Sequence, residues 1–235
     1  AGPAGIFSAY ELTKSVSTKN LKILLIDKGQ LVENRQKTDV MTGFGGSGTF
    51  SDGKLHFTPV LSHEKMFHLY SISEYQEYLD YVEKLFIDFG VPPEYYPKDL
   101  KKTQEIVDIA QKNNIKLFIR KTIHVGTDRL PAVIQNIANH LKKHNIELLP
   151  NTEVVDLLVK DNVIYGVKLI DGTELNAKYV ICAPGRYNSS WVEKLSQKYN
   201  LEKLYDKIEV GVRVEFPAAL IAKHAELMYE TVYLM

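Results

Sequence analysis

A glycine turn, a helical stretch and an apolar run ending in an acidic residue follow one another over residues 1–27, and this order constrains the fold most. Gly2 and Gly5 precede residues 6–14, whose apolar side chains recur at helical spacing. Residues 21–26 form a nearly continuous apolar run, typical of a buried parallel strand, and end at Asp27. In a dinucleotide-binding turn, such glycines bring backbone N–H groups to a pyrophosphate, and an acid about 20 residues further on binds a ribose. The segment therefore predicts an α/β fold with a dinucleotide site; the alternative is an ordinary turn and a solvent-facing aspartate.

A second glycine-rich stretch covers residues 40–53. It contains five glycines, at positions 43, 45, 46, 48 and 53. Such density indicates unusual backbone angles or the close approach of another group to the main chain. Small residues in a loop of this kind let backbone donors reach ligand oxygens. The alternative interpretation is a mobile surface loop.

The remaining chain alternates helical and strand-like stretches. We expect a helix that is capped by Ser73 and ends before Gly90, and a second helix over about residues 99–113. A third helix is predicted to start at Thr127 or Asp128 and to bury one apolar stripe, formed by Leu130, Val133, Ile134, Ile137 and Leu141. The chain after Trp191 is also expected to be helical. Strand-like patterns occur at residues 115–119, 146–149, 179–183 and 209–216.

Three further strand-like runs follow each other closely, at residues 154–159, 163–170 and 173–175. The pairs Asp161-Asn162 and Asp171-Gly172 separate them, and such pairs are typical of tight hairpin turns. The spacing predicts a small antiparallel meander.

Charge and cysteine content exclude several classes of protein. The 235 residues include 29 Lys and Arg and 29 Asp and Glu, so net charge gives no reason to expect a nucleic acid or an anionic membrane as partner. The single cysteine, Cys182, excludes an intramolecular disulfide framework, a CxxC redox pair and a multi-cysteine metal site, and we expect no metal. The sequence has neither an apolar run of about 20 residues nor a signal-peptide pattern, so we expect a cytoplasmic location. The chain lacks an initiator Met and a strand before Ala1, and we interpret it as part of a longer protein.

Several motifs, in this order, resemble a known superfamily. The segments AGPAG, LLIDKG, GFGGSGTFSDGKL, NTEVVDLLV, VIYGVKLIDGTEL and YVICAPG resemble FAD-dependent dehydrogenases of the glutathione-reductase-like superfamily. Together with IHVGTDRL and GVRVEFP, they resemble more narrowly a family of uncharacterised bacterial FAD-dependent dehydrogenases. The resemblance covers most of the chain except residues 61–99.

The resemblance implies an α/β fold: a Rossmann-like FAD/NAD(P)-binding domain with a three-stranded antiparallel meander and an inserted substrate or cap region. Residues 1–60 and 121–205 would form the FAD-binding domain. Residues 61–120 would form a mostly helical insertion, and residues 206–235 would start a substrate domain.

The same resemblance assigns cofactor-binding residues. The pyrophosphate turn would be Gly2, Pro3, Ala4 and Gly5; Asp27 would hold the ribose and Lys28 would flank the adenosine. The second loop would lie beside the pyrophosphate and flavin, through Gly45, Gly46, Ser47, Gly48 and Thr49. Glu153 and Val154 would hold the adenine through main-chain groups, and the last strand would pass the cofactor at Ala183, Pro184 and Gly185. Many relatives carry Glu at the position of Asp27, and a Gly-Asp pair near the ribityl phosphate lies in a segment that this chain does not include.

These features predict an FAD-dependent oxidoreductase that transfers hydride or electrons between an unidentified small molecule and the flavin, with an unknown electron acceptor. A second glycine fingerprint for NAD(P) and a cysteine pair are absent from the sequence, which argues against two-dinucleotide and disulfide reductases. The alternatives are an FAD-dependent tRNA-modifying flavoprotein, a non-catalytic dinucleotide-binding sensor or assembly module, and an NAD enzyme without flavin. The second glycine loop and the meander count against the last of these.

Catalytic residues are not assigned from the sequence. His56, His124 and Arg213 are candidate proton donors or anion ligands, and Lys54 could meet a phosphate or a reduced flavin. For each of them a structural or solvated role is the more common alternative. We expect Cys182 to be buried in the strand over residues 179–183, as a core residue.

Overall fold

The computed structural model describes residues 1–14, 16–18, 20–36, 38–59, 66–205 and 210–234. The chain divides into two compact units, each assembled from separate segments. Unit 1 consists of Ala1–Ser51 and Thr127–Lys207, and unit 2 of Asp52–Gly126 and Ile208–Met235. The assignment of cofactor and substrate roles to parts of the chain stays a prediction.

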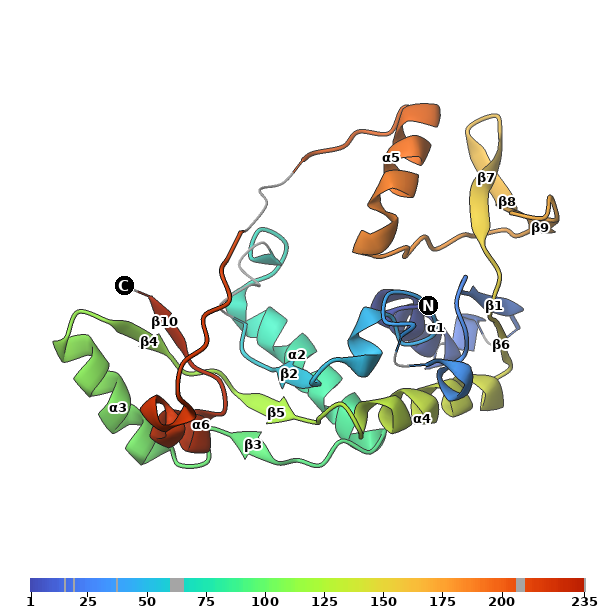
Figure 1. Ribbon diagram of the computed structural model, residues 1–235. Coiled ribbons are helices and arrows are strands. Elements are labelled where there is room, and N and C mark those ends of the chain that lie inside the picture. Colours follow the sequence, from blue (N-terminus) through green and yellow to red (C-terminus); the bar gives the residue numbers. More distant parts are fainter. Residues whose placement is uncertain (15, 19, 37, 60–65, 206–209, 235) are drawn as a thin grey trace. The chain divides into compact units, whose positions relative to one another are not determined.

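Unit 1 contains a pair of parallel strands with two helices packed nearby (Figure 1). The strands β1 (Ile23–Ile26) and β6 (Ile146–Leu149) pair in register, from Ile23 opposite Ile146 to Ile26 opposite Leu149. The helices are α1 (Pro3–Lys14) and α4 (Leu130–Lys143). All five residues of the predicted α4 stripe are buried, which places the core of the unit along this helix. The helix begins at Leu130, later than predicted, because residues 127–129 form a turn before Pro131 enters the first helical turn.

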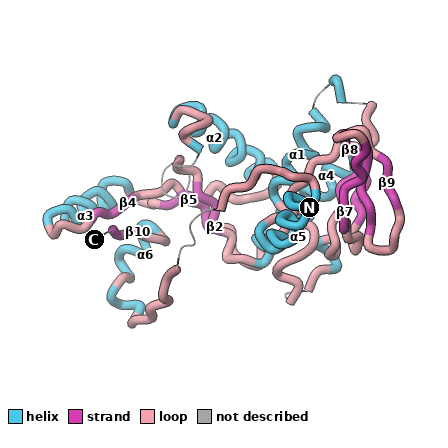
Figure 2. Tube along the Cα trace, turned by 90° about the horizontal axis from the view of Figure 1, so that it is seen from above, coloured by secondary structure: helices cyan, strands magenta, loops and turns pink. Residues whose placement is uncertain are grey.

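An antiparallel sheet of three strands follows β6 in unit 1. The strands β7 (Val154–Lys160), β8 (Val163–Leu169) and β9 (Glu174–Asn176) lie in the order β7-β8-β9 (Figure 2). Asp161 and Asn162 both have positive φ, at 51° and 62°, as a two-residue hairpin turn of the right twist requires. The helix α5 (Ser189–Lys198) contacts β7, where the Trp191 indole N–H donates to the Val155 carbonyl at 2.8 Å.

Two predicted strands are wrong. Residues 179–183 are not in a strand, and Cys182 is exposed rather than buried, with Tyr179 71% and Ile181 62% exposed beside it. Residues 210–216 are also outside any strand, and Val210 and Val212 are at least 90% exposed; residue 209 lies outside the described residues. In both cases the apolar pattern is present, but no described strand offers its backbone as a hydrogen-bonding neighbour.

Unit 2 contains a second small sheet, which the sequence did not predict. Its strands β2 (Lys54–His56), β5 (Thr122–His124) and β3 (Tyr95–Tyr96) lie in the antiparallel order β2-β5-β3. The helix α2 (Ile72–Asp88) is capped by Ser71 and not by Ser73, because the Ser71 hydroxyl and the Glu74 carboxylate form a reciprocal capping box.

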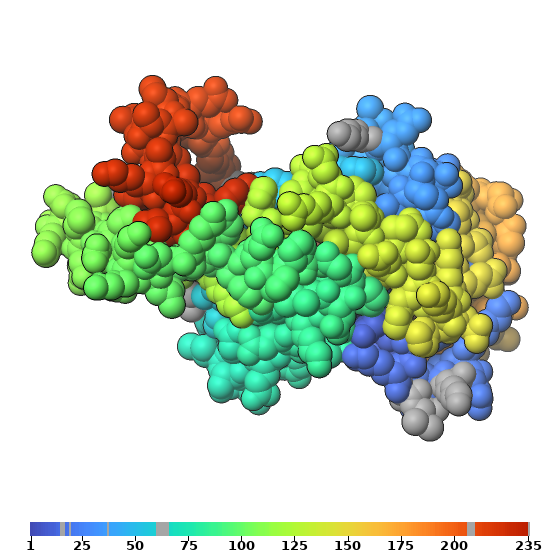
Figure 3. Space-filling view, turned by 90° about the horizontal axis from the view of Figure 1, so that it is seen from below, coloured from blue at the N-terminus to red at the C-terminus, as the bar shows by residue number. Residues whose placement is uncertain are grey.

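A separate core in unit 2 joins the segment before β5 to the C-terminal segment. The helix α3 (Leu100–Lys112) and the strand β4 (Lys116–Phe118) pack with α6 (Ala222–Met228) and β10 (Val232–Leu234), which pairs antiparallel with β4. Ala110, Leu117 and Met228 are the buried residues at the centre. Figure 3 shows the red C-terminal segment against the green segment that holds α3 and β4. Among the described helices, none has both the length and the apolar character that crossing a membrane requires.

Candidate cofactor site

At the N-terminus of α1, backbone N–H groups of the first turn are available as hydrogen-bond donors. Pro3 occupies the first helical position, and the Ile6 N–H donates to the Gly2 carbonyl at 3.0 Å. The N–H groups of Ala4 and Gly5, in the first turn, therefore have no carbonyl partner within the helix. The first turn contains no acidic side chain. Donors and helix dipole together favour an anion at this position.

The second glycine loop lies directly against this turn. The Gly45 N–H donates to the Ala1 carbonyl at 3.0 Å. A Cβ atom added at Gly46 would lie 3.0 Å from the Gly2 Cα and 3.3 Å from the Pro3 Cδ, which is tighter than ordinary side-chain contact. Gly46 also has a φ of 71°, which disfavours any residue with a Cβ. The two glycine segments thus form one continuous surface of backbone atoms.

A buried arginine, Arg35, donates hydrogen bonds to several backbone carbonyls of the second loop. Arg35 is 7% exposed, and its Nη1 donates to the Phe44 carbonyl at 2.8 Å, the Gly46 carbonyl at 3.1 Å and the Thr49 hydroxyl at 3.0 Å. Its Nη2 donates to the carbonyls of Asp39 and Val40. Burial lowers the pKa of Arg35, against the opposing charges of Asp27 and Asp39. Sequence reasoning missed this residue because a single arginine between a strand and a loop carries no local signal of burial.

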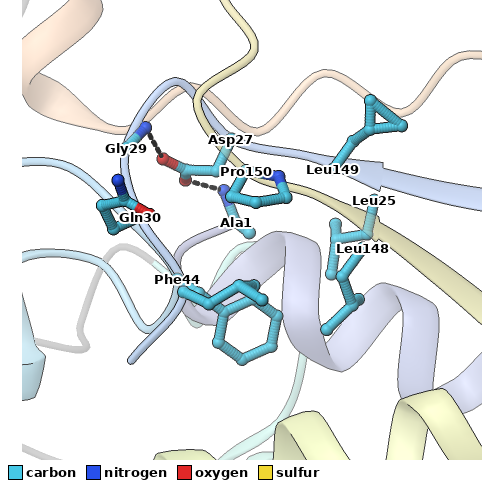
Figure 4. A pocket seen from close by; sticks show the side chains of 10 residues that line it. Ala1, Leu25, Asp27, Gly29, Gln30, Phe44, Leu148, Leu149 and Pro150 are labelled. Carbon is cyan, nitrogen blue, oxygen red and sulfur yellow. Dashed lines mark hydrogen bonds and ion pairs between the residues drawn. The ribbon is translucent and has the colours of Figure 1, made fainter. Parts of the chain in front are cut away.

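Asp27 follows the last residue of β1 and binds the same loop through Gly43; Figure 4 shows its bonds to Gly29 and Ala1. Its Oδ1 accepts from the Gly29 N–H at 2.8 Å and the Gly43 N–H at 2.9 Å, and its Oδ2 contacts the backbone nitrogen of Ala1. A Cβ atom added at Gly29 would lie 2.5 Å from the Gly43 nitrogen, so the two backbones are in close contact. A carboxylate has about four lone-pair positions, so Asp27 keeps acceptor capacity for a ligand. Its predicted ribose contact stays a prediction.

Lys28 lies beside the segment that follows residues 179–183. The Lys28 ammonium donates to the Asn188 Oδ1 at 2.9 Å and lies 4.9 Å from the centre of the Tyr187 ring. The Asn188 amide in turn donates to the Pro184 carbonyl at 2.7 Å. The side chain of Asn188 therefore links Lys28 to Pro184, one of the residues predicted to contact the cofactor.

The adenine-binding residues predicted at the start of β7 lie next to the end of β1. The Thr152 N–H donates to the Asp27 carbonyl at 2.9 Å, which places Glu153 one residue beyond this contact. The Glu153 carbonyl accepts from the Ile170 N–H at 3.0 Å, so this main-chain group is already hydrogen-bonded within the protein. Val154 is the first residue of β7.

Two glycines of the site face open space, whereas a neighbouring side chain points inward. Among the described residues, chain neighbours aside, no heavy atom lies within 4 Å of a Cβ position at Gly48 or Gly185. Thr49 is 1% exposed, and its hydroxyl donates to the Gly46 carbonyl at 3.1 Å, while Ser47 is exposed. A Cβ at Gly5 would make ordinary contacts with Leu25 at 3.5 Å and Ala183 at 3.9 Å. A ligand in this site would therefore meet loop backbone rather than the Thr49 side chain.

The family comparison decides which dinucleotide is expected. Residues 52–205, more than half of the chain, match the model of the FAD binding domain family. The chain belongs to the FAD binding domain family. FAD is accordingly its cofactor. The match includes Glu153, Val154 and residues 183–185, whereas the Gly2–Gly5 turn and the glycines from Gly43 to Gly48 lie before it. The glycine contacts, the helix end without an acid and the buried cation fit the pyrophosphate of FAD.

Individual relatives of this FAD-binding chain are distant. An uncharacterized protein of Clostridium beijerinckii is 25% identical over 94% of the chain, and the chain spans 36% of that protein's length. Among solved structures, L-amino acid deaminase from Proteus vulgaris has a TM-score of 0.48 at 15% identity, covering 85% of this chain and 48% of that one. Glycine oxidase from Bacillus cereus has a TM-score of 0.44 at 14% identity, covering 84% and 57%. Scores this low carry no argument about substrate.

The four basic residues that the sequence analysis considered lie in different parts of unit 2. Lys54, His56 and His124 lie on the strands β2 and β5 of unit 2. Arg213 is exposed on the segment after Lys207 and pairs with Glu215 at 3.0 Å. The pairing of β2 with β5 therefore brings the first three together.

Proposed function

We propose that this chain is the cofactor-binding part of an FAD-dependent oxidoreductase of the glutathione-reductase-like superfamily. The observation that carries the proposal is the contact between Gly2 and Gly46, which joins both glycine segments in a chain of an FAD-binding family. Bound FAD supplies a group that accepts a hydride or electron pair from a substrate and passes it to an acceptor. The substrate is a small molecule, and neither it nor the acceptor is identified.

The protein's own groups bind and orient the cofactor in this proposal. The N–H groups of Ala4 and Gly5 would donate to pyrophosphate oxygens, and Gly46 would let the chain approach them closely. Arg35 would add a positive charge next to the loop, since its five hydrogen-bond partners are four carbonyls and one hydroxyl, although the charges of Asp27 and Asp39 also act on it. Asp27 would accept from the ribose, and residues 183–185 would contact the cofactor.

The decisive experiment for this function is anaerobic reduction of the purified full-length protein. We expect its flavin absorption to bleach on addition of an oxidisable small molecule from a substrate panel and to return on addition of an electron acceptor. A protein that holds FAD, is reduced chemically and reoxidised, yet is reduced by no member of a broad panel would favour the sensor interpretation. Flavin that changes only when a tRNA substrate is supplied would favour the tRNA-modifying alternative.

A further inference from the structure

The sheet β2-β5-β3 of unit 2 has one apolar face and one polar face. Side chains alternate between the two faces of a sheet, and directly paired residues share a face. Lys54 is paired with His124, and His56 with Thr122, so these four polar side chains lie on one face. Leu55 and Ile123 lie on the other, where Ile123 is 1% exposed. The polar face thus gathers two histidines and a lysine over two strands of three residues each.

A strained turn presents two further polar residues to this face. Tyr229 has a φ of 58° and a ψ of −59°, and the Glu230 N–H donates to the Met228 carbonyl at 2.6 Å. A three-residue turn with positive φ at its centre is rare and strained, above all for a bulky residue. Such strain persists where the surrounding structure requires it, often at functional sites. The Tyr229 hydroxyl lies 2.6 Å from the His124 Nε2, and the two rings stack at 4.0 Å.

Three basic side chains converge on the carboxylate of Glu230. Its Oε1 lies 3.4 Å from the Lys54 Nζ, and its Oε2 lies 3.5 Å from the His56 Nε2 and 3.4 Å from the Arg120 Nη2. The Arg120 side chain is only 12% exposed. Burial alone would lower the pKa of Lys54, but its hydrogen bonds and charge interactions with Asp52 and Glu230 outweigh this and raise it.

The carboxylate nevertheless makes only long contacts. The Lys54 ammonium donates a long hydrogen bond to Oε1 at 3.4 Å, and the contacts of Oε2 with His56 and Arg120 are also longer than the 2.7–3.2 Å of ordinary N–H···O hydrogen bonds. The buried Oε2 atom has no hydrogen-bond partner among the described residues. If this ion-pair cluster served only stability, its nitrogen and oxygen atoms would be expected to approach to ordinary hydrogen-bonding distance. A buried acceptor without a partner lowers the free energy of unfolding.

We propose that Lys54, His56 and Arg120 form a binding site for the carboxylate group of a ligand, and that Glu230 is its internal occupant. The chemical class follows from this occupant, since the site already surrounds a carboxylate. Movement of the strained turn at Tyr229 would withdraw Glu230 and leave two permanently charged bases, Lys54 and Arg120, against one acid, Asp52. The Tyr229 hydroxyl and the His124 ring stand beside the vacated position as hydrogen-bonding groups. That the ligand is the substrate of the enzyme rests on the proposed function; the existence of the site does not.

The test is calorimetric titration of the full-length protein with succinate as the carboxylate probe and inorganic phosphate as the competing anion. Glu230→Gln keeps the shape of the side chain and removes its charge, so we expect it to bind succinate at least about tenfold more tightly than wild type, the equivalent of about 1.4 kcal/mol. Adding Arg120→Gln, or Lys54→Gln if the arginine variant does not fold, should remove that gain. Lys102→Gln, at an exposed lysine of α3, is the matched control and should leave succinate affinity unchanged.

Equal succinate affinity in wild type and Glu230→Gln, or a gain that survives Arg120→Gln and Lys54→Gln, would overturn the proposal. A gain for phosphate equal to that for succinate would overturn the assignment to carboxylates. Binding is measured as heat and not as turnover. A protein that binds succinate at this site but reduces no flavin would therefore contradict the proposed oxidoreductase and leave the carboxylate site intact.

Discussion

At the scale of single residues, Arg35 is a buried charge that the carboxylates of Asp27 and Asp39 influence through their charge, while its hydrogen bonds go to loop carbonyls and a hydroxyl. Its two terminal nitrogens bind four loop carbonyls and one hydroxyl between residues 39 and 49. The same guanidinium can therefore shape the loop and, in the cofactor site that we propose, supply positive charge near the pyrophosphate.

Arg35→Met should separate these two roles. The change leaves loop carbonyls unpaired and should lower the free energy of unfolding by about 3 kcal/mol, since each unsatisfied buried group costs about 1–3 kcal/mol. At a temperature where the variant stays folded, its affinity for ADP should fall more than its affinity for adenosine, which lacks the pyrophosphate. Arg35→Lys, which keeps the charge but not the planar fork, should retain part of the ADP preference. An equal loss of affinity for ADP and for adenosine would show that Arg35 has only a structural role.

Glu83 is a second buried charge, on α2, and it predicts a pH effect. It accepts from the Tyr95 hydroxyl and the Lys121 ammonium, both at 2.6 Å, and the bond to Glu83 raises the pKa of Tyr95 to about 12. An unfolded tyrosine titrates near 10. The protonated phenol is favoured in the folded state, so its contribution to stability is complete below pH 10 and is lost as the pH rises through about 12. The difference in unfolding free energy between wild type and Tyr95→Phe should shrink over that interval; a difference that is constant with pH would contradict this.

At the scale of elements, the start of α2 offers a matched pair of substitutions. The Ser71 hydroxyl accepts from the Glu74 N–H, and the Glu74 carboxylate accepts from the Ser71 N–H at 2.8 Å. The Ser71 hydroxyl also donates to the Glu74 carboxylate at 2.7 Å, and this bond, followed by the one from the Ser71 N–H, lowers the pKa of Glu74. Ser71→Ala should therefore destabilise unit 2 by about 1 kcal/mol, the usual effect of losing an N-cap, whereas Ser73→Ala inside the helix should change stability by less than about 0.5 kcal/mol. Denaturant unfolding of both variants measures this, and a larger effect at Ser73 would be inconsistent with the observed cap.

Elements with a strong local pattern were predicted well, and elements that depend on distant partners were not. The apolar stripe of α4 repeats over four turns, so its buried face could be assigned without knowledge of its neighbours. Strands β2 and β5 have only three residues each and lie more than 60 positions apart, so neither carries a local signal. The runs at 179–183 and 210–216 show the opposite error, because an apolar pattern predicts a strand only if another strand completes its hydrogen bonds.

At the scale of the whole molecule, the chain passes between its two units at residues 51–52, 126–127 and 207–208. The residues assigned to FAD by resemblance all fall in unit 1, although they come from five separate segments of the sequence. The sequence could identify those segments individually. It could not show that Gly46 contacts Gly2, that Arg35 supports the loop, or that three basic residues meet at Glu230, because each of these depends on tertiary folding.

The most direct test of the central claim compares the FAD content of Gly46→Ala and Gly48→Ala in the full-length protein. Each protein is purified, its flavin absorption is recorded, and the dinucleotide released by heat is identified. A Cβ at Gly46 is strained by a φ of 71° and lies 3.0 Å from the Gly2 Cα, whereas a Cβ at Gly48 meets open space. Because a residue with a Cβ at such angles costs about 1–2 kcal/mol, we expect Gly46→Ala to bind FAD about tenfold more weakly and Gly48→Ala to match wild type. Wild-type protein that neither contains FAD nor can be reconstituted with it, or a Gly46→Ala protein with unchanged affinity, would contradict the account.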